Sequence, residues 1–284
     1  MTCITGKTKI IGVWGHPVGH SRSPAMHNAA LRKLGLNWVY VPFDVSPDQI
    51  PEAIAGIKAL GLVGVNITVP LKELILPYVI ASAAALQIGS VNTLYNHDGS
   101  LYGDNTDGRG FLRSLQDAGQ SGQERSALIL GAGGSARAVA FALASHGTRC
   151  QISNRTVSRA GALVSDINHV FPGCAEVAGW GTEASKFDLL VNTTSLGMNP
   201  NEDALPMLPP EVFADRPFVY DLIYAPARTK LLVLAEQAGC RTSNGITMLV
   251  HQGALSLSLW TGLSVEEIPV KSMEEAVRSS LQDY

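Results

Sequence analysis

A glycine-rich turn between a strand and a helix is the feature that most restricts the fold of this chain. The turn lies in LILGAGGSARA, residues 128–138, after a short apolar run. Gly131, Gly133 and Ala136 have the spacing G-x-G-x-x-G/A, which allows a tight turn, approach of the backbone to a pyrophosphate, and close packing of helix on strand. Such turns also occur for packing alone, but the flanking strand, helix and next strand favour a dinucleotide-binding Rossmann domain. The residues expected to contact the cofactor are Gly131, Ala132, Gly133, Gly134, Ser135 and Ala136.

The end of the next strand decides which dinucleotide is expected. A domain that holds NAD carries an Asp or Glu here, for the adenine ribose. In ISNRTVSRA, residues 152–160, the place holds Asn154, Arg155 and Thr156. A guanidinium and neutral donors suit a 2′-phosphate, so the sequence predicts NADP(H). The alternative is a solvated turn in which Asn154 only starts the next helix.

Short β-branched runs alternate with helical patterns along the whole chain, which predicts an α/β protein with largely parallel sheets. In the first half we expect strands at 9–15, 38–45 and 62–69, helices at 23–36 and 49–60, and a hairpin at 92–105 with its turn at Asp98 and Gly99. In the second half we expect four strands: one at 127–130, one that ends near residue 153, one at 187–194 and one at 217–223. The expected helices lie near 106–118, at 134–146 and from about 157, and two more follow from about 244.

The helix at 23–36 carries clear end signals. Ser23 can cap it, Pro24 suits the first helical position and Gly35 suits the exit.

Length and charge limit the possible functions. A chain of 284 residues exceeds the usual size of a single core, so two domains are expected. A net charge of -3 gives no reason to expect general attraction to nucleic acid or to an anionic membrane. Any anion site must therefore be local.

The cysteines and the apolar stretches predict a cytoplasmic protein. Cysteines at 3, 150, 174 and 240 have no spacing typical of a zinc site or a disulfide framework, so reduced thiols are expected. The N-terminal stretch lacks the apolar run of a signal peptide, and residues 74–88, the most apolar, are too few to span a bilayer.

Metal binding is not expected either. His16 and His20 are four residues apart, but Pro17 and Gly19 between them indicate a turn, and no third ligand stands out.

Four polar motifs in the first half lie at strand ends or helix starts, where side chains can converge on a small ligand: GHSRSP at 19–24, NITVPLKE at 66–73, SVNT at 90–93 and GDNTDGRG at 103–110. Ser21 and Ser23 bracket a helix start, which would suit a carboxylate, although capping alone would explain Ser23. Lys72 and Asp107 are the candidates for proton chemistry. Their alternatives are a solvated surface lysine and a helix cap.

Eight motifs, taken together and in their order along the chain, resemble those of shikimate dehydrogenases over about residues 10–262. They are SRSP, NITVPLKE, GSVNT, GDNTDGRG, GAGGSARA, NRTVSR, NTTSLGM and NGITMLVHQG. The resemblance implies a substrate domain at 1–106, completed by 244–284, an NADP-binding Rossmann domain at 107–243, and a cleft between them. The implied reaction is reversible reduction of 3-dehydroshikimate to shikimate by NADPH in aromatic amino-acid biosynthesis, by way of chorismate.

The resemblance also implies a role for each matching residue. Lys72 and Asp107 match the catalytic pair, and Ser21 and Ser23 the ligands of the substrate carboxylate. The implied ligands of the substrate hydroxyls are Asn66, Thr68, Asn92 and Gln252. Tyr224 resembles the residue that closes over the substrate. The 2′-phosphate clamp matches Asn154, Arg155, Thr156 and Arg159, and the nicotinamide is expected near Gly245 and Met248.

The chemistry of the reaction supports the assignment of Lys72. Hydride transfer to a ketone develops negative charge on oxygen, so a proton donor must lie within hydrogen-bond reach. Lys72 can donate that proton, act as the base in the reverse direction, and be held in position by Asp107.

Departures from the family pattern are modest: Leu71, Leu257 and Arg22 stand where many relatives differ, and none removes a required group. Two other functions stay open. One is quinate dehydrogenase, disfavoured by the two serines and the NADP-type NRT motif, and the other is a catalytically silent ligand sensor, disfavoured by intact Lys72 and Asp107. The only expected partner is the small-molecule substrate, and the chain is expected to be a monomer or a homodimer.

Overall fold

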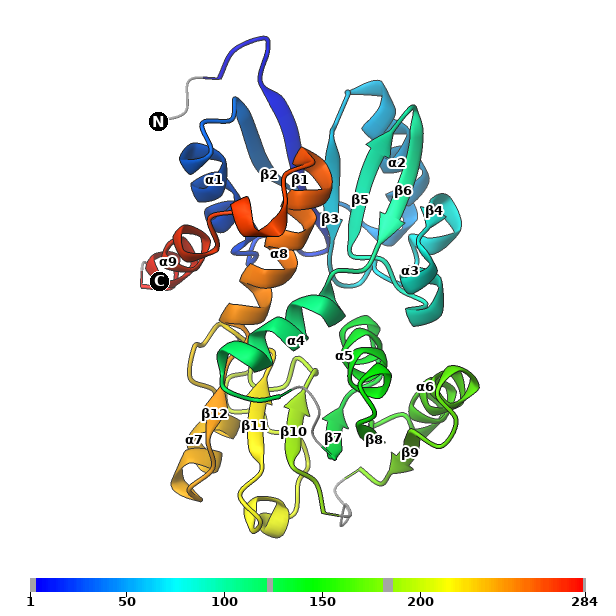
Figure 1. Ribbon diagram of the computed structural model, residues 1–284, viewed down its shortest axis with the longest axis vertical. Helices are drawn as coiled ribbons and strands as arrows, with labels where there is room; N and C mark the ends of the chain where they lie inside the picture. Colours follow the sequence, from blue (N-terminus) through cyan, green and yellow to red (C-terminus); the bar gives the residue numbers. More distant parts are fainter. Residues whose placement is uncertain (1–3, 122–124, 181–185, 283–284) are drawn as a thin grey trace. The chain divides into compact units, whose positions relative to one another are not determined.

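The chain divides into two compact units (Figure 1). The computed structural model describes residues 4–121, 125–180 and 186–282. The first unit consists of Met1–Gly110 and Leu249–Tyr284, and the second of Phe111–Met248. These boundaries fall inside helices α4 (Asp107–Asp117) and α8 (Ile246–Thr261), whereas the boundaries inferred from the sequence lie beside the starts of the same helices.

The first unit contains a six-stranded mixed sheet with the strand order β2-β1-β3-β5-β6-β4. Strand β1 pairs in parallel with β2 and β3, and β4 pairs in parallel with β6, but β5 runs antiparallel to both of its neighbours. The strands are β1 (Lys9–Gly15), β2 (Trp38–Asp44), β3 (Gly64–Ile67), β4 (Ile80–Ala81), β5 (Thr93–His97) and β6 (Ser100–Asp104).

The expectation of a largely parallel sheet is confirmed with one exception, because β5 alone runs against the other five strands of this sheet. The expected hairpin is present, and both residues of its turn have positive φ, 49° at Asp98 and 77° at Gly99. A two-residue turn of this kind joins antiparallel strands, so the hairpin that the sequence predicts itself requires the change of direction.

The helices of the first unit are α1 (Ser23–Lys33), α2 (Ile50–Ala59), α3 (Ala83–Ile88) and α9 (Val270–Ser280), with α8 contributed from Leu249 onward and short 3₁₀ turns η1 (Pro47–Gln49), η2 (Leu76–Tyr78) and η4 (Val265–Glu267). The apolar stretch at 74–88 folds as η2, β4 and α3, none of which the sequence analysis predicted. Within the described residues, no helix is both long and apolar enough to cross a membrane.

Helix α1 corrects the predicted role of Ser23. The N-cap residue is Arg22, and Ser23 is already inside the helix, where its N–H is accepted by the Ser21 hydroxyl at 3.3 Å. The predicted exit is confirmed, because Gly35 has φ 67° and the N–H groups of Gly35 and Leu36 bond back to the carbonyl groups of the last turn.

The second unit has a parallel six-stranded sheet, with the order β12-β11-β10-β7-β8-β9. Its strands are β7 (Ser126–Leu130), β8 (Arg149–Ser153), β9 (Ala175–Ala178), β10 (Leu189–Asn192), β11 (Phe218–Asp221) and β12 (Thr242–Ser243). Read from β9 and numbered within the unit, the order is that of the doubly wound dinucleotide-binding fold, whose direction of winding reverses between its first and fourth strands, here β7 and β10. This predicts a ligand site beyond the carboxyl ends of β7 and β10.

The central strands of this sheet are apolar on both faces, as parallel strands covered by helices require. Every residue of β10 and β11 is buried. The helices are α4, α5 (Gly134–Ser145), α6 (Val157–Val170) and α7 (Lys230–Gln237), with a 3₁₀ turn η3 (Pro210–Phe213). Strands β9 and β12, which the sequence analysis missed, are the edge strands of the sheet.

Three cysteines carry free thiols. Cys150 and Cys240 are buried and Cys174 is partly buried. Burial raises the pKa of the Cys150 thiol to about 12, so this residue behaves as a small apolar side chain. Cys3 lies outside the described residues.

Candidate active site

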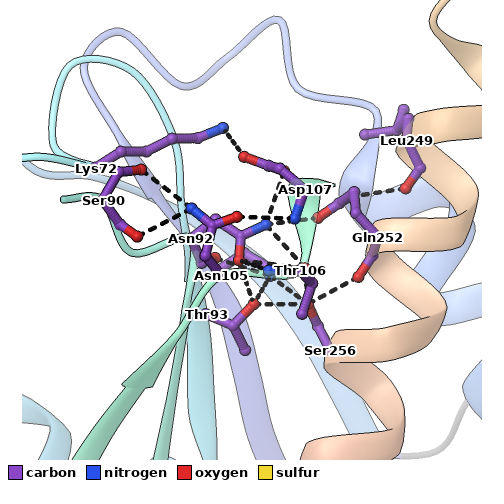
Figure 2. Close-up of polar contacts among 11 residues, drawn as sticks. Lys72, Ser90, Asn92, Thr93, Asn105, Thr106, Asp107, Leu249, Gln252 and Ser256 are labelled. Atoms are coloured by element: carbon purple, nitrogen blue, oxygen red, sulfur yellow. Dashed lines mark hydrogen bonds and ion pairs between the residues drawn. The ribbon is translucent and has the colours of Figure 1, made fainter. Parts of the chain in front are cut away.

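Lys72 and Asp107 form a close ion pair in the first unit (Figure 2). The ammonium Nζ lies 2.6 Å from the carboxylate Oδ2, and the two side chains are only 13% and 5% exposed. A solvated surface lysine does not have this environment, so the surface alternative for Lys72 is wrong. The pair places a proton donor and its counter-charge within one hydrogen bond of each other.

Asp107 is held by donors on both sides. It is the first residue of α4, and its N–H is accepted by Asn105 Oδ1 at 3.0 Å. Its Oδ1 accepts a hydrogen bond from Asn92 Nδ2 at 2.8 Å, while Oδ2 faces Lys72. A carboxylate at a helix N-terminus is also stabilised by the helix dipole.

Asn92 has a defined amide orientation. Its Oδ1 lies 2.8 Å from the backbone N–H of Thr106, which can only donate, so this atom must be the oxygen. The amide NH₂ therefore points toward Asp107, and it also lies 3.3 Å from Gln252 Oε1. Gln252 in turn donates through Nε2 to the Leu249 carbonyl at 2.7 Å, which fixes its own orientation.

Asn66 connects this group to the interior of the sheet. It lies near the end of β3, is 5% exposed, and accepts a hydrogen bond from the Tyr40 hydroxyl at 2.9 Å. Its Nδ2 lies within hydrogen-bond distance of Ser256 and Thr93. Five of the predicted site residues are thus linked by hydrogen bonds to one another or through shared neighbours: Asn66, Lys72, Asn92, Asp107 and Gln252.

The other predicted substrate residues of this unit lie at element ends. Ser21 precedes α1 and is partly buried, and Ser23 is buried in the first turn. Thr68 directly follows β3, and its methyl group lies beside Gly15 at the end of β1. Strands β1 and β3 are parallel neighbours, so the ends of both strands face the same edge of the sheet.

The glycine turn of the second unit has the backbone that a dinucleotide site requires. Gly131 has φ 113°, and a Cβ placed on it would lie 2.5 Å from Thr193 Oγ1, so the fold itself demands glycine there. Gly133 is different, because its φ is -92° and a Cβ would meet nothing within 4 Å. Packing explains Gly131 but not Gly133, whose lack of a side chain leaves the N-terminus of α5 open to a ligand.

The residues of the predicted 2′-phosphate clamp follow β8. Arg155, Thr156 and Arg159 are exposed, and Asn154 is partly buried with its Nδ2 bonded to the Thr156 carbonyl at 2.9 Å. Helix α6 begins at Val157 with Thr156 as its N-cap residue, so Asn154 does not itself start the helix. Exposed Arg155 also fits a solvated turn, so the 2′-phosphate clamp stays a prediction.

The residues assigned to the nicotinamide and to closure over the substrate lie around the end of β11. A Cβ on Gly245 would lie 1.9 Å from the Leu222 carbonyl oxygen, and Met248 is 5% exposed. Tyr224 is partly buried, three positions after Asp221. Asp221 is fully buried and accepts hydrogen bonds from Thr229 Oγ1, Asn192 Nδ2 and the Ile223 N–H, at 2.7, 3.0 and 3.1 Å.

Comparison with known proteins identifies the family. Residues 13–94 match the shikimate dehydrogenase substrate binding domain, and residues 245–278 match the shikimate 5′-dehydrogenase C-terminal domain. A shikimate dehydrogenase (NADP(+)) of Moorella thermoacetica is 46% identical, over 99% of this chain and 96% of its own length. The chain belongs to the shikimate dehydrogenase family.

Solved structures of the shikimate dehydrogenase family share the fold. Shikimate 5-dehydrogenase from Thermus thermophilus, crystallised with NADP(H) and shikimate, has a TM-score of 0.87 and 39% identity, over 96% of this chain and 100% of that one. Quinate dehydrogenase from Corynebacterium glutamicum, in complex with NAD, has a TM-score of 0.86 and 32% identity, over 96% and 99%. The predicted α/β fold, with an N-terminal substrate domain and an NADP-binding Rossmann domain, is confirmed.

Several polar residues that support the candidate site were not singled out from the sequence. Thr93 and Thr106 lie inside motifs recognised as polar, and Ser256 lies four residues after Gln252 on α8, so all three could have been found by spacing. Tyr40 lies in the middle of β2, where only the three-dimensional structure brings it to Asn66.

The histidines considered for a metal site have a simpler arrangement. His16 Nδ1 lies 2.7 Å from Asp44 Oδ1, and both side chains are more than half exposed. Among the residues that the structure describes, no three His, Cys, Asp or Glu side chains are placed to share a metal ion.

Proposed function

We propose that this chain is an NADP-dependent shikimate dehydrogenase that reversibly reduces 3-dehydroshikimate to shikimate in aromatic amino-acid biosynthesis. The observation that carries the proposal is the buried Lys72–Asp107 pair, with Nζ and Oδ2 2.6 Å apart, within a network that includes Asn92 and Gln252. The relatives named above, at 46% and 39% identity, support the substrate and the cofactor. We expect the enzyme to act in the cytoplasm as a monomer or a homodimer.

Lys72 supplies the proton in this mechanism. NADPH, when bound, supplies the hydride to the carbonyl carbon of the substrate. The ammonium of Lys72 donates a proton to the ketone oxygen as negative charge develops there, and in the reverse direction the neutral amine removes the hydroxyl proton. Asp107 holds the lysine nitrogen in one place, because its other oxygen is already bound to Asn92.

The surrounding network holds the side chains of the site in position before the substrate binds. The amides of Asn92 and Gln252 have single orientations before any ligand binds. Groups that do not reorganise during the reaction lower the barrier more than mobile ones. We assign the substrate hydroxyls to Asn66, Thr68, Asn92 and Gln252, the substrate carboxylate to Ser21 and Ser23, and closure over the substrate to Tyr224.

The second unit supplies the cofactor site in this proposal. The open backbone at Gly133 and the N-terminus of α5 suit the pyrophosphate. Exposed Arg155 and Arg159, with Thr156, suit the 2′-phosphate, and we assign the nicotinamide to the neighbourhood of Gly245 and Met248. No carboxylate occupies the first residues after β8, where an NAD-specific site would place one.

The discriminating experiment is an absorbance assay of four combinations, shikimate or quinate with NADP or NAD. The proposal predicts that shikimate with NADP has the highest kcat/KM. A preference for quinate would instead indicate that this chain is a quinate dehydrogenase, like the relative from Corynebacterium glutamicum that was crystallised with NAD. Binding of shikimate without turnover in any combination would indicate a sensor.

A further inference from the structure

Ser256 is a hydroxyl group beneath the site to which neither the family resemblance nor the mechanism assigns a role. It lies on α8, one turn after Gln252, and is fully buried. Its Oγ lies 2.9 Å from Asn66 Nδ2, 2.7 Å from Thr93 Oγ1, 3.0 Å from the Gln252 carbonyl oxygen and 3.3 Å from Thr106 Oγ1. Figure 2 shows it at the point where α8 meets the polar side chains of the sheet.

The hydrogens available on the groups around Ser256 limit which atom donates in each of its hydrogen bonds. The amide NH₂ of Asn66 can only donate, so Ser256 accepts there. Thr93 has one hydroxyl hydrogen, and Asn92 Oδ1, which can only accept, lies 2.9 Å from it. Ser256 also has one hydroxyl hydrogen, which it can give to the Gln252 carbonyl at 3.0 Å or to Thr93 at 2.7 Å. With the hydrogen of Thr93 on Asn92, the shorter contact between the two hydroxyls is a hydrogen bond only when Ser256 donates to Thr93 and not to Gln252.

We propose that Ser256 is a positioning residue for the reaction, because it joins the substrate ligand Asn66 to the acid–base pair through a chain of hydrogen bonds that runs in one direction when Ser256 donates to Thr93. The chain runs through Tyr40, Asn66, Ser256, Thr93, Asn92 and Asp107. Bonds aligned in this way polarise and strengthen one another. The inference deepens the proposed function and rests on it.

Removal of the Ser256 hydroxyl has a defined consequence at the reacting end. Thr93 loses its closest hydrogen-bond partner and keeps only the longer bond from Asn66 Nδ2, so its hydroxyl is freer to turn away from Asn92, and Asn66 loses the nearest of its acceptors. Asn92 then orients Asp107 less firmly, so the Lys72 nitrogen is less well placed to deliver its proton. The expected loss is the rate equivalent of one neutral hydrogen bond, about two- to tenfold.

The test is single-turnover reduction of 3-dehydroshikimate by NADPH, with enzyme in excess, in wild type and Ser256→Ala. The amplitude reports the fraction of active sites and the rate constant reports the step on them. We expect the rate constant to fall about two- to tenfold at unchanged amplitude, with the Kd for NADP unaltered. A purely structural role would lower the amplitude and leave the rate constant alone, which would overturn the inference.

Ser258→Ala is the matched control. Ser258 lies on the same helix and its hydroxyl donates to the Leu263 carbonyl at 2.6 Å. Ser258→Ala also removes one serine hydroxyl from α8, but this hydroxyl does not belong to the chain of hydrogen bonds. We therefore expect the amplitude and the rate constant of wild type. An equal slowing in both variants would show that α8, and not the chain through Ser256, sets the rate.

Thr93→Val provides a second line of evidence if Ser256→Ala folds poorly. It breaks the same chain one link further on with a side chain of the same shape, so it should slow the rate constant by a similar factor. The double variant should be no slower than the slower single one, whereas multiplied losses would show two independent effects.

Ser256→Thr, which keeps the hydroxyl, should recover most of the rate. A variant as slow as Ser256→Ala would contradict a role for the hydroxyl. The wild-type reaction separates this inference from the function beneath it. If wild type does not turn over shikimate, the proposed function is wrong and the inference falls with it; if wild type does and Ser256→Ala keeps its rate constant, the inference alone is wrong.

Discussion

The two units prepare for their ligands in different ways. In the first, Asp107 is buried and Lys72 is partly buried, and each oxygen of the carboxylate already has its donor. In the second, Arg155 and Thr156 are exposed, and Gly133 faces open space. The fold thus sets the acid–base geometry in advance, while it offers the cofactor only a backbone shape and nearby charge. Substitutions of the acid–base pair in the first unit should therefore change rates, and substitutions at the exposed residues of the second should change affinities.

The buried carboxylates of the two units sharpen this contrast. Asp107 faces a cation, whereas Asp221 accepts hydrogen bonds from a hydroxyl, an amide and a backbone N–H. Burial accordingly raises the pKa of Asp221 to about 6. Asp221 anchors the segment between β11 and α7, since its partners include Ile223 and the N-cap residue Thr229. Burial of a carboxylate is therefore not enough to indicate catalysis, and the neighbouring cation is what distinguishes Asp107.

The largest expected effect is that of Lys72→Ala. A positioned acid or base contributes about 10²–10⁴-fold to the rate, equivalent to about 3–5 kcal/mol of barrier. We expect kcat to fall by that factor, while the melting temperature and the Kd for NADP stay near wild type. Steady-state kinetics, calorimetry and cofactor titration measure the three quantities. Retention of more than about a tenth of kcat, with chemistry rate-limiting, would remove Lys72 from the mechanism.

Asp107→Asn tests whether the pair acts as one unit. The amide keeps the size of the side chain but loses the charge beside Lys72, so this variant should also be slow. Combining it with Lys72→Ala should cost much less than the product of the two single losses. Multiplied losses would mean that the 2.6 Å ion pair does not act as a single catalytic unit.

Arg155→Ala probes the second unit and should change affinity instead of rate. If the guanidinium pairs with the 2′-phosphate, its loss removes contacts worth about 1.5–3 kcal/mol and weakens NADP binding about ten- to a hundredfold, with NAD little changed. Calorimetric titration of both cofactors measures this. Arg149, exposed at the opposite end of β8, gives the matched control Arg149→Ala, which should bind both cofactors normally. Equal losses of affinity for NADP and NAD in Arg155→Ala would show that Arg155 supports the fold and does not bind the 2′-phosphate.

Acid should act on the two units with opposite signs. His27 is fully buried, stacks on Tyr40 with ring centroids 4.2 Å apart, and burial lowers its pKa from 6.5 to about 3. Below pH 6.5 the unfolded chain binds a proton that the folded chain does not, so stability falls on acidification. For Asp221 the folded pKa of about 6 exceeds the unfolded 3.8, so its contribution is present at low pH and lost as pH rises through 6.

Urea unfolding at pH 7 and pH 5 separates these contributions. Acidification should lower the free energy of unfolding by about 2 kcal/mol through His27 and raise it by about 1 kcal/mol through Asp221. In His27→Phe, which keeps an aromatic ring against Tyr40, the loss on acidification should disappear, whereas in Asp221→Asn it should deepen. Identical pH dependence in wild type and both variants would show that neither group titrates as its burial predicts.

The parts of the fold that local signals specify could be predicted from the sequence. The glycine turn, the hairpin at Asp98 and Gly99, and the exit of α1 at Gly35 each depend on a few neighbouring residues. The missed strands β4, β9 and β12 have only two to four residues, and they form because a neighbouring strand offers its free edge. Pairing of that kind leaves no periodic signal in so short a segment.

The candidate site divides in the same way. Lys72, Asp107 and Asn92 stand in recognisable motifs, and the structure brings them together. Ser256 comes from a helix and lies 163 positions after Thr93 in the sequence, and Tyr40 comes from the middle of a strand. Their roles follow from long-range contacts that no local pattern encodes.

Ser21→Ala should have the smallest effect, and it tests whether the substrate carboxylate binds at the start of α1 in the first unit. Ser21 precedes α1 and its hydroxyl accepts the N–H of Ser23 at 3.3 Å, so its loss leaves the helix start and the Ser23 hydroxyl available to a carboxylate. We therefore expect a rise of about three- to tenfold in the KM for shikimate, the equivalent of one hydrogen bond, with kcat near wild type and the Kd for NADP unchanged. The control is Ser46→Ala, because Ser46 caps η1 in the same unit and should leave the KM alone. Parallel changes in the KM for shikimate and the Kd for NADP would contradict the assignment of the two ligands to different units.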